Sequence, residues 1–448
     1  MQAHVATITA DTAPSGRSHA RLISIPYLVL RSTTAAGAFA MGFVQTLVFA
    51  RVLSPDRFSI FILVGAIGAS LWVADLGLAK IVFVELRAAR LAGKVNDHAA
   101  GHASAVILLY ALLAAAGALG CFAVTIARPS FSLIDAVDFA LFFLFVALNL
   151  VWFSLRSISI SVDEYLFYEK LELIRRIVNV ATMLAMLVGL PFTAFLIVSN
   201  ALWAVLITSA VAKLIARGAL VLRVHHFGHE LIRFFRTNKG AIMRSGTAAL
   251  SDLFTYTFPY YVVPAAFGLG APVIILEVTF RIFRGASMIY VAACDLAVPG
   301  QTRAFATRDA PKLIRTTLLA VGLCCIPAAC ASALMIFAAQ PLFAFLLRSA
   351  ATVPMPVAHI TVVLLIANLA HMVALSLLQH TGFFRNIARV GLSLAAAMIL
   401  ATAVVLFLKV DFVGFIATYA VVYAGGAIAY AIAAIRGPIH AVSPRKPA

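Results

Sequence analysis

The chain has 448 residues, of which 63% are hydrophobic and 11% are charged, and its formal net charge at pH 7 is +17. Soluble domains are about 45–50% apolar and about 25% charged, so this composition excludes a soluble enzyme and predicts an all-α, multi-pass membrane protein. The positive charge does not indicate a nucleic-acid partner, because the basic residues gather in the loops between apolar runs.

The chain begins with about twenty polar residues and shows no apolar run ahead of a small-residue cleavage site, so we expect no cleavable signal peptide. Apolar runs that are long enough to cross a bilayer as helices then follow one another. The predicted spans, about twelve in number, are 32–49, 58–84, 103–126, 139–160, 173–190, 192–212, 241–267, 272–298, 314–339, 357–378, 387–408 and 412–434.

The loops on alternate sides of these spans differ in charge. Most of the 34 Lys and Arg lie in the two terminal segments and in the loops 85–102, 161–172, 213–240, 299–313 and 379–386. The loops of the opposite side hold Arg51, Arg57, Arg128, Arg348 and Lys409. Because basic loops are retained in the cytoplasm, both termini are predicted to be cytoplasmic.

The longest connection, 213–240, divides the spans into two halves of six. It interleaves basic residues with Leu and Phe, a mixture that predicts an interfacial helix lying on anionic lipid headgroups. The predicted parts are a cytoplasmic N-terminal segment 1–31, a six-helix lobe 32–212, the basic linker 213–240, a second six-helix lobe 241–434 and a cytoplasmic tail 435–448.

Charged residues at membrane depth are the best indicators of function, since each costs about 2.5–3.5 kcal/mol to insert and must face protein or water. Arg281 and Arg284 lie three residues apart inside the eighth span, hence on one face. Glu277 lies four residues before Arg281 and could pair with it, which leaves Arg284 without an obvious partner in its own helix. One interpretation is a cationic cavity wall that binds an anionic substrate. The alternative is a structural ion pair with Asp252 or Asp75 on a neighbouring helix.

Other polar residues complete the candidate site. Asp252 lies in a span that also carries Pro259 and Pro264, and such a kinked helix is typical of cavity walls in transporters. Arg31 and Lys80 lie near span ends, where snorkelling to the headgroups also explains them. The candidate substrate-binding residues are Arg281, Arg284, Arg31, Asp252, Asp75 and Lys80.

Catalytic, metal and cofactor motifs are missing from the sequence. The five cysteines lie inside apolar runs without a C-x-x-C pair, and there is no phosphate-binding G-x-x-x-x-G-K-[ST] loop, G-x-S-x-G elbow or H-E-x-x-H helix. His225, His226, His229 and Glu230 have a spacing that a metal could use, but they lie in the basic linker, where a solvated face is the simpler interpretation. We therefore predict no catalytic residue, metal or cofactor.

The segment 50–58 reads A-R-V-L-S-P-D-R-F, and A-D-L-G-L follows at 74–78, with Glu85 further on. These residues resemble the polysaccharide transporter family, whose members carry an A-R-x-L-[ST]-P-x-x-[FY]-G turn and a D-x-G-L near the end of the second helix. Ser59 replaces the usual Gly. The family contains O-antigen and exopolysaccharide flippases and belongs to the multidrug/oligosaccharidyl-lipid/polysaccharide (MOP) export superfamily.

The resemblance implies that the chain flips a lipid-linked oligosaccharide, carried on a polyprenyl diphosphate, across the bacterial inner membrane by alternating access. The implied partners are membrane lipids and the polymerase and glycosyltransferases of polysaccharide assembly. A drug antiporter of the same superfamily is one alternative, although it would need acidic residues in its cavity. A membrane polymerase or ligase is another, although such enzymes carry a large outer loop and the outer loops here are short.

Overall fold

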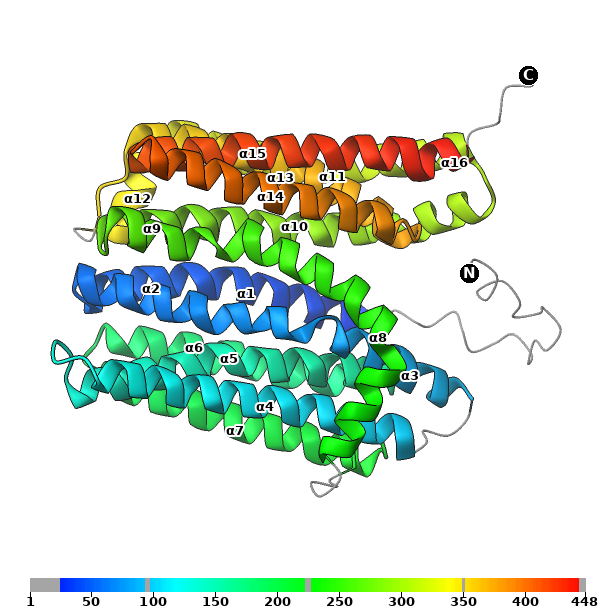
Figure 1. Ribbon diagram of the computed structural model, residues 1–448, viewed down its shortest axis with the longest axis horizontal. Coiled ribbons are helices and arrows are strands. Elements are labelled where there is room, and N and C mark those ends of the chain that lie inside the picture. The colour runs from blue at the N-terminus through cyan, green and yellow to red at the C-terminus, as the bar shows by residue number, and fades with distance from the viewer. Residues whose placement is uncertain (1–24, 93–96, 222–226, 349–350, 443–448) are drawn as a thin grey trace.

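In Figure 1 the chain forms two lobes of roughly parallel helices, with one long helix crossing between them. The computed structural model describes residues 25–92, 97–221, 227–348 and 351–442, apart from the side chains of some residues within helices. These residues form helices and turns and no strand, which confirms the all-α fold class.

The N-lobe contains α1 (Ile25–Val52), α2 (Pro55–Ser70), the 3₁₀ turn η2 (Leu71–Asp75), α3 (Leu78–Leu91), α4 (Asp97–Ile126), α5 (Leu133–Ser161), α6 (Tyr165–Met186) and α7 (Phe192–Ala216). The crossing helix is α8 (Phe227–Asp252). The C-lobe contains the π-helical turn η4 (Leu253–Thr257), α9 (Pro259–Phe267), α10 (Ala271–Ala306), α11 (Ala310–Phe337), α12 (Ala339–Leu347), α13 (Met355–His380), α14 (Phe384–Phe407), α15 (Phe412–Ala434), η5 (Ile435–Ile439) and α16 (His440–Val442).

Eight helical stretches of the described chain are long and apolar enough to cross a membrane. The remaining four predicted spans correspond to α1, α6, α10 and the α8–η4–α9 stretch. Charged residues inside α6 and α10 lower the apolar character of these two helices. About twelve crossings are therefore consistent with the structure, and the charged helices are the ones in which function is to be sought.

Three predicted boundaries differ from the structure. The span 58–84 is interrupted after α2, because Leu76 and Gly77 adopt left-handed backbone conformations with φ of 43° and 77°. The predicted linker 213–240 does not end before the next span, since α8 begins at Phe227 and continues unbroken through residue 240. The predicted loop 340–356 contains most of the short helix α12. This helix is apolar and packs against the bundle, where part of it is buried.

Each lobe is organised around one central helix. In the most apolar stretches of α5 and α13, 56% of the residues are buried, against 22–39% for the other candidate spans, so these two helices form the lobe cores. Packed aromatic rings fill the N-lobe core near the α1–α2 turn; for example, the centroids of Phe61 and Phe192 are 4.6 Å apart. Interlocking rings of this kind make a stiff body that can move as a unit.

The lobes meet at the end of the bundle that carries the α1–α2 and α9–α10 turns, which we call the distal end (left in Figure 1). There Arg51 on α1 donates a 2.7 Å hydrogen bond to the carbonyl of Phe345 on α12 and lies over its ring. At the opposite, proximal end α8 crosses from α14 in the C-lobe to α3 and α4 in the N-lobe. The crossing helix thus continues the chain from one lobe to the other and packs against both of them.

The break between α2 and α3 depends on Asp75. Its carboxylate accepts hydrogen bonds from the backbone N–H groups of Gly77 (3.2 Å) and Ala79 (3.0 Å), which begin α3, and from the hydroxyl of buried Tyr110 on α4 (2.5 Å). We predict that Asp75→Ala lowers the stability of the purified protein by roughly 1–3 kcal/mol, since it removes a cap and leaves a buried hydroxyl without its partner.

The measurement is the apparent melting temperature in detergent. Asp411→Ala is the matched control. The Asp411 carboxylate caps α15 by accepting a 2.9 Å hydrogen bond from the N–H of Gly414, and this bond stays within one helix. Equal losses for the two variants would contradict the tertiary role of Asp75.

Candidate functional site

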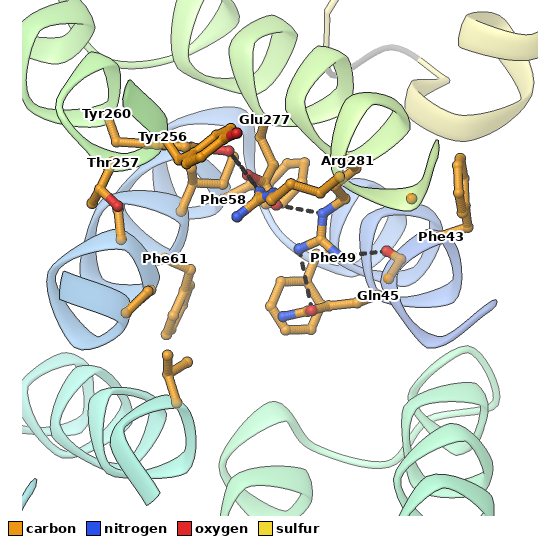
Figure 2. A pocket seen from close by; sticks show the side chains of 18 of the residues that line it. Phe43, Gln45, Phe49, Phe58, Phe61, Tyr256, Thr257, Tyr260, Glu277 and Arg281 are labelled. Carbon is orange, nitrogen blue, oxygen red and sulfur yellow. Dashed lines mark hydrogen bonds and ion pairs between the residues drawn. The ribbon is translucent and has the colours of Figure 1, made fainter. Parts of the chain in front are cut away.

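A cavity of about 300 Å³ lies between the two lobes (Figure 2). Its walls come from α1, α2 and α5 on one side and from η4, α9 and α10 on the other. It is lined by Gly42, Phe43, Gln45, Phe49, Phe58, Phe61, Ile62, Gly65, Ala66, Ala69, Phe142, Val146, Tyr256, Thr257, Tyr260, Glu277, Arg281, Arg284, Gly285 and Met288. Only Glu277, Arg281 and Arg284 among these lining residues carry charge, so the formal charge of the lining is positive.

The three charged residues form one cluster on α10. Their spacing of four and then three residues places them on one face of the helix. Glu277 is buried and accepts hydrogen bonds from Arg281 Nε, from Arg284 Nη2 (3.0 Å) and from the Tyr260 hydroxyl. One carboxylate therefore serves two guanidinium groups, and one positive charge of the pair remains unbalanced within the cluster.

Arg281 joins the lobes. Beyond Glu277, it donates from Nη1 to the backbone carbonyl of Gly42 (2.5 Å) and from Nη2 to Oε1 of Gln45 (3.1 Å), both on α1. Figure 2 shows its side chain extending from α10 toward α1. Its side chain is only 17% exposed, so this group mainly holds the two lobes together at mid-depth.

Arg284 is the more accessible of the two arginines. Its side chain is 44% exposed, and it donates to the hydroxyl of Tyr260 (2.7 Å) and to the Phe280 carbonyl (3.2 Å). Within the described part of the chain, its Nη1 has no hydrogen-bond partner. A planar guanidinium fixed on one edge and free on the other is suited to bind phosphate or carboxylate oxygens.

Aromatic rings form most of the remaining wall. Phe49, Phe58 and Phe61 face the cavity from the N-lobe, and Tyr256 and Tyr260 face it from the C-lobe (Figure 2). Water-filled volume next to aromatic faces suits a ligand with both polar and apolar surfaces, and the low-dielectric walls strengthen the field of the arginines.

The structure brings together two of the six predicted site residues, Arg281 and Arg284. Asp252 ends α8 just before the π-helical turn η4; it is exposed and lies outside the cavity lining. Asp75 is occupied in capping α3, and Lys80 is exposed on α3, so both lie away from the cavity. Arg31 belongs to α1, but its side chain lies outside the described residues.

Of the ion pairs considered from the sequence, that of Glu277 with Arg281 is confirmed, whereas no pair with Asp252 or Asp75 is found. Arg281 and Arg284 pair with Glu277 of their own helix, and neither contacts Asp252 or Asp75. The interpretation of Arg284 as a counter-ion for Asp252 is therefore wrong, because the side chain turns instead toward Tyr260 and the cavity.

A second charged cluster lies in α6 and was missed by the sequence analysis. Glu172 accepts hydrogen bonds from Arg175 (2.7 Å), Arg176 (2.7 Å) and the indole of Trp152 (2.7 Å), and Arg176 also donates to Met41 Sδ on α1 (3.2 Å). The signal was the pattern E-x-x-R-R, whose Glu172 ended the predicted loop 161–172 and whose two arginines began the predicted span 173–190. The helix in fact begins at Tyr165, so these charges lie inside it.

An apolar cavity of about 230 Å³ adjoins the charged one. Phe43 lines both cavities, and α10 lies between them. One face of α10 lines the charged cavity with Arg281 and Arg284, and another face lines the apolar cavity with Ile282, Ala286 and Ile289. Its remaining lining residues come from α11 and α12: Pro327, Ala331, Leu334, Met335 and Leu342. Since no charged side chain lines it, this cavity suits an apolar group.

Metal ligation has no support from the described side chains. No group of three or more His, Cys, Asp or Glu residues among them has a metal-binding arrangement. The site is therefore described by its charges, its aromatic walls and its adjoining apolar cavity.

Comparison with known proteins identifies the architecture. No known protein family and no curated protein matches the sequence. An inward-facing multidrug resistance MATE family transporter of the MOP superfamily matches the structure with a TM-score of 0.62 at 13% identity, over 93% of this chain and 98% of that chain. A MOP superfamily transporter from Pyrococcus furiosus Vc1, whose binding pocket is described as having reverse polarity, matches with a TM-score of 0.59 at 12% identity. The match covers 94% of this chain and 95% of that chain.

An outward-facing MATE family transporter of the same superfamily gives a TM-score of 0.58 at 13% identity, over 93% of this chain and 94% of that chain. At such identities the likeness shows the fold, and these neighbours are transporters rather than enzymes. The resemblance to the polysaccharide transporter family itself stays a prediction. The chain has the multi-pass transporter fold seen in members of the MOP superfamily.

Proposed function

We propose that the protein exports an anionic amphipathic substrate, a lipid-linked oligosaccharide on a polyprenyl diphosphate, by alternating access between its two lobes. The observation that carries the proposal is the lining of the interlobe cavity, in which two guanidinium groups share a single carboxylate. A diphosphate needs cations along its path, and sugar hydroxyls need a wet path because each costs a few kcal/mol to bury without a partner.

The adjoining apolar cavity supports an amphipathic substrate. Ile289 and Leu334 line it and are 42% and 45% exposed, which supports an opening of this cavity toward the lipid. Phe43 forms a wall of both cavities. A substrate with its phosphate at Arg284 could therefore place the first part of its hydrocarbon chain between α1, α10 and α11.

The proposed orientation places the proximal end in the cytoplasm, as the basic loops predict. In this orientation the contacts between the lobes at the distal end, including that of Arg51 with Phe345, would close the outer side, and the structure would correspond to an inward-facing state. An anion arriving at Arg281 would compete with the Gly42 carbonyl and Gln45. Substrate binding would thereby weaken the attachment of α1 to α10, and an inside-negative potential would favour outward movement of the negative charge.

Asp252 is the proposed coupling residue. Its carboxylate ends α8 and makes no hydrogen bond or ion pair with the described residues, although it lies in a stretch that must cross the membrane. An exposed carboxylate without a counter-ion in such a stretch is expected to exchange a proton with water. The π-helical turn that follows is a type of irregularity found at functional sites.

A drug antiporter is the second candidate, because the similar structures include multidrug transporters and the cavity is rich in aromatic residues. The two functions make opposite demands on the charged cluster. A cationic drug would depend on Glu277, whereas an anionic lipid would depend on the arginines. Dye efflux by Glu277→Gln and Arg284→Gln variants separates them: loss in the first alone supports the antiporter.

We predict that Arg284→Gln lowers export of the lipid-linked oligosaccharide by roughly 10- to 100-fold, because a charge-assisted bond to phosphate is lost. Arg284→Lys should retain part of the activity, since it keeps the charge. The measurement is surface polysaccharide in a strain that lacks its flippase. Arg303→Gln, at an exposed position of the same helix, is the control. Normal export by Arg284→Gln at normal protein levels would refute the cationic site.

We also predict that Ala331→Phe, which fills the apolar cavity, lowers flipping of a long-chain substrate by at least about tenfold in proteoliposomes. Binding of a water-soluble sugar diphosphate should be unchanged, because the charged cavity is untouched. Ala333→Phe is the matched control, since Ala333 lies two residues away on α11 and is exposed. Equal flipping by the two variants would exclude the apolar cavity as the chain site.

For the coupling residue, we predict that Asp252→Asn abolishes the stimulation of transport by a pH gradient. Exchange of labelled substrate without a gradient should persist, because the amide cannot carry a proton but leaves the cavity intact. Both are measured in proteoliposomes. If a pH gradient still stimulates transport by Asp252→Asn, a group other than Asp252 couples transport to the proton.

A further inference from the structure

A buried histidine lies where α8 docks on the N-lobe. His102 on α4 is fully buried, and its Nδ1 lies 2.8 Å from Oε2 of Glu85 on α3. Its Nε2 points toward Glu230 on α8, with 4.0 Å to the nearer oxygen. The ring therefore lies between two carboxylates that come from two different helices, one in the lobe and one in the crossing helix.

One side of this arrangement is fully hydrogen-bonded. Glu85 accepts from His102 and, through its other oxygen, from Asn238 Nδ2 of α8 (3.0 Å). Burial raises the pKa of Glu85, but the hydrogen bonds from His102 and Asn238 outweigh it and leave the pKa lowered. Glu85 is thus a carboxylate at neutral pH, which places a hydrogen on Nδ1 of His102.

The other side lacks a hydrogen-bond partner. Nε2 of His102 and Oε2 of Glu230 are both buried, and neither has a hydrogen-bond partner among the described residues. With a neutral ring and an ionised Glu230, two acceptors would face each other in a dry place, which is unfavourable. One additional proton removes the conflict, because an imidazolium with two N–H groups pairs with both carboxylates.

The surroundings confine that proton. Phe234 of α8 packs edge-on against the His102 ring, with centroids 4.9 Å apart. Among the residues that the structure describes, His98, whose ring centroid is 4.1 Å from that of His102, and Arg233 of α8, whose charge acts on His98, also face the site. A proton is the ligand that this geometry fits, because its binding turns Nε2 of His102 from an acceptor into a donor that faces Glu230.

We propose that His102, Glu85 and Glu230 form a proton-binding site that holds the first half of α8 on the N-lobe and releases it when the proton leaves. The docked state binds the extra proton, so docking strengthens as the pH falls and weakens as it rises. The far end of α8 continues into η4, whose Tyr256 and Thr257 line the interlobe cavity. The proton therefore affects the cavity wall through one continuous helix, whatever the cargo is.

The test is hydrogen exchange of the α8 segment 227–239 in the purified full chain, measured by mass spectrometry from pH 5.5 to 8.5 and corrected for intrinsic exchange. In the unaltered protein we expect protection to fall roughly tenfold or more between these limits. His102→Gln should abolish the dependence on pH. Glu230→Gln should keep α8 protected at pH 8.5, because its amide can donate to the neutral Nε2.

Glu164→Gln is the matched control. Glu164 pairs with Arg217 and Lys213 at the same end of the bundle, away from α8, and its removal should leave the pH dependence of α8 unchanged. Protection that does not vary with pH in the unaltered protein would overturn the proposal, as would a Glu230→Gln variant that loosens at high pH. The measurement uses no substrate, so its outcome is independent of the proposed export function.

Discussion

The arrangement of the two lobes depends on the hydrogen bonds of Arg281. This guanidinium belongs to the C-lobe, shares Glu277 with Arg284, and donates to the carbonyl of Gly42 and to Gln45 on the first helix of the N-lobe. Breaking a buried, charge-assisted contact without replacing it is costly, so the lobes separate here only when another acceptor becomes available. The hydrogen bonds of Arg281 therefore hold the lobes together, and an anion that replaces the Gly42 and Gln45 acceptors would release them.

Charge distinguishes this cavity within a fold that carries many kinds of cargo. A fold does not specify a substrate; the side chains of the site do. Here the polar groups are two arginines, one glutamate, Gln45, Thr257 and tyrosine hydroxyls, surrounded by phenylalanine rings, with an apolar cavity behind Phe43. This combination of cationic, polar and apolar surfaces is the basis on which we propose an anionic amphipathic substrate.

Local signals in the sequence predicted most of the fold and all three charged residues of the cluster. Apolar runs located the helices, and the spacing of Glu277, Arg281 and Arg284 placed them on one face. The interlobe partner of Arg281 could not be predicted, because it is a backbone carbonyl at Gly42 that only tertiary packing brings near. Asp75 illustrates the opposite error: a carboxylate at membrane depth suggested a ligand, yet the break in the helix required it as a cap.

The first helix is also held from its other side. Arg176 of the N-lobe donates to Met41, and Arg281 of the C-lobe donates to the adjacent Gly42. A thioether is a far weaker acceptor than a carbonyl. At this level α1 is therefore hydrogen-bonded to both lobes, although most of its packing is against α6 of its own lobe. In the proposed transport cycle, separation of the lobes breaks the bond of Arg281 to Gly42, while the contact of Arg176 with Met41 can remain.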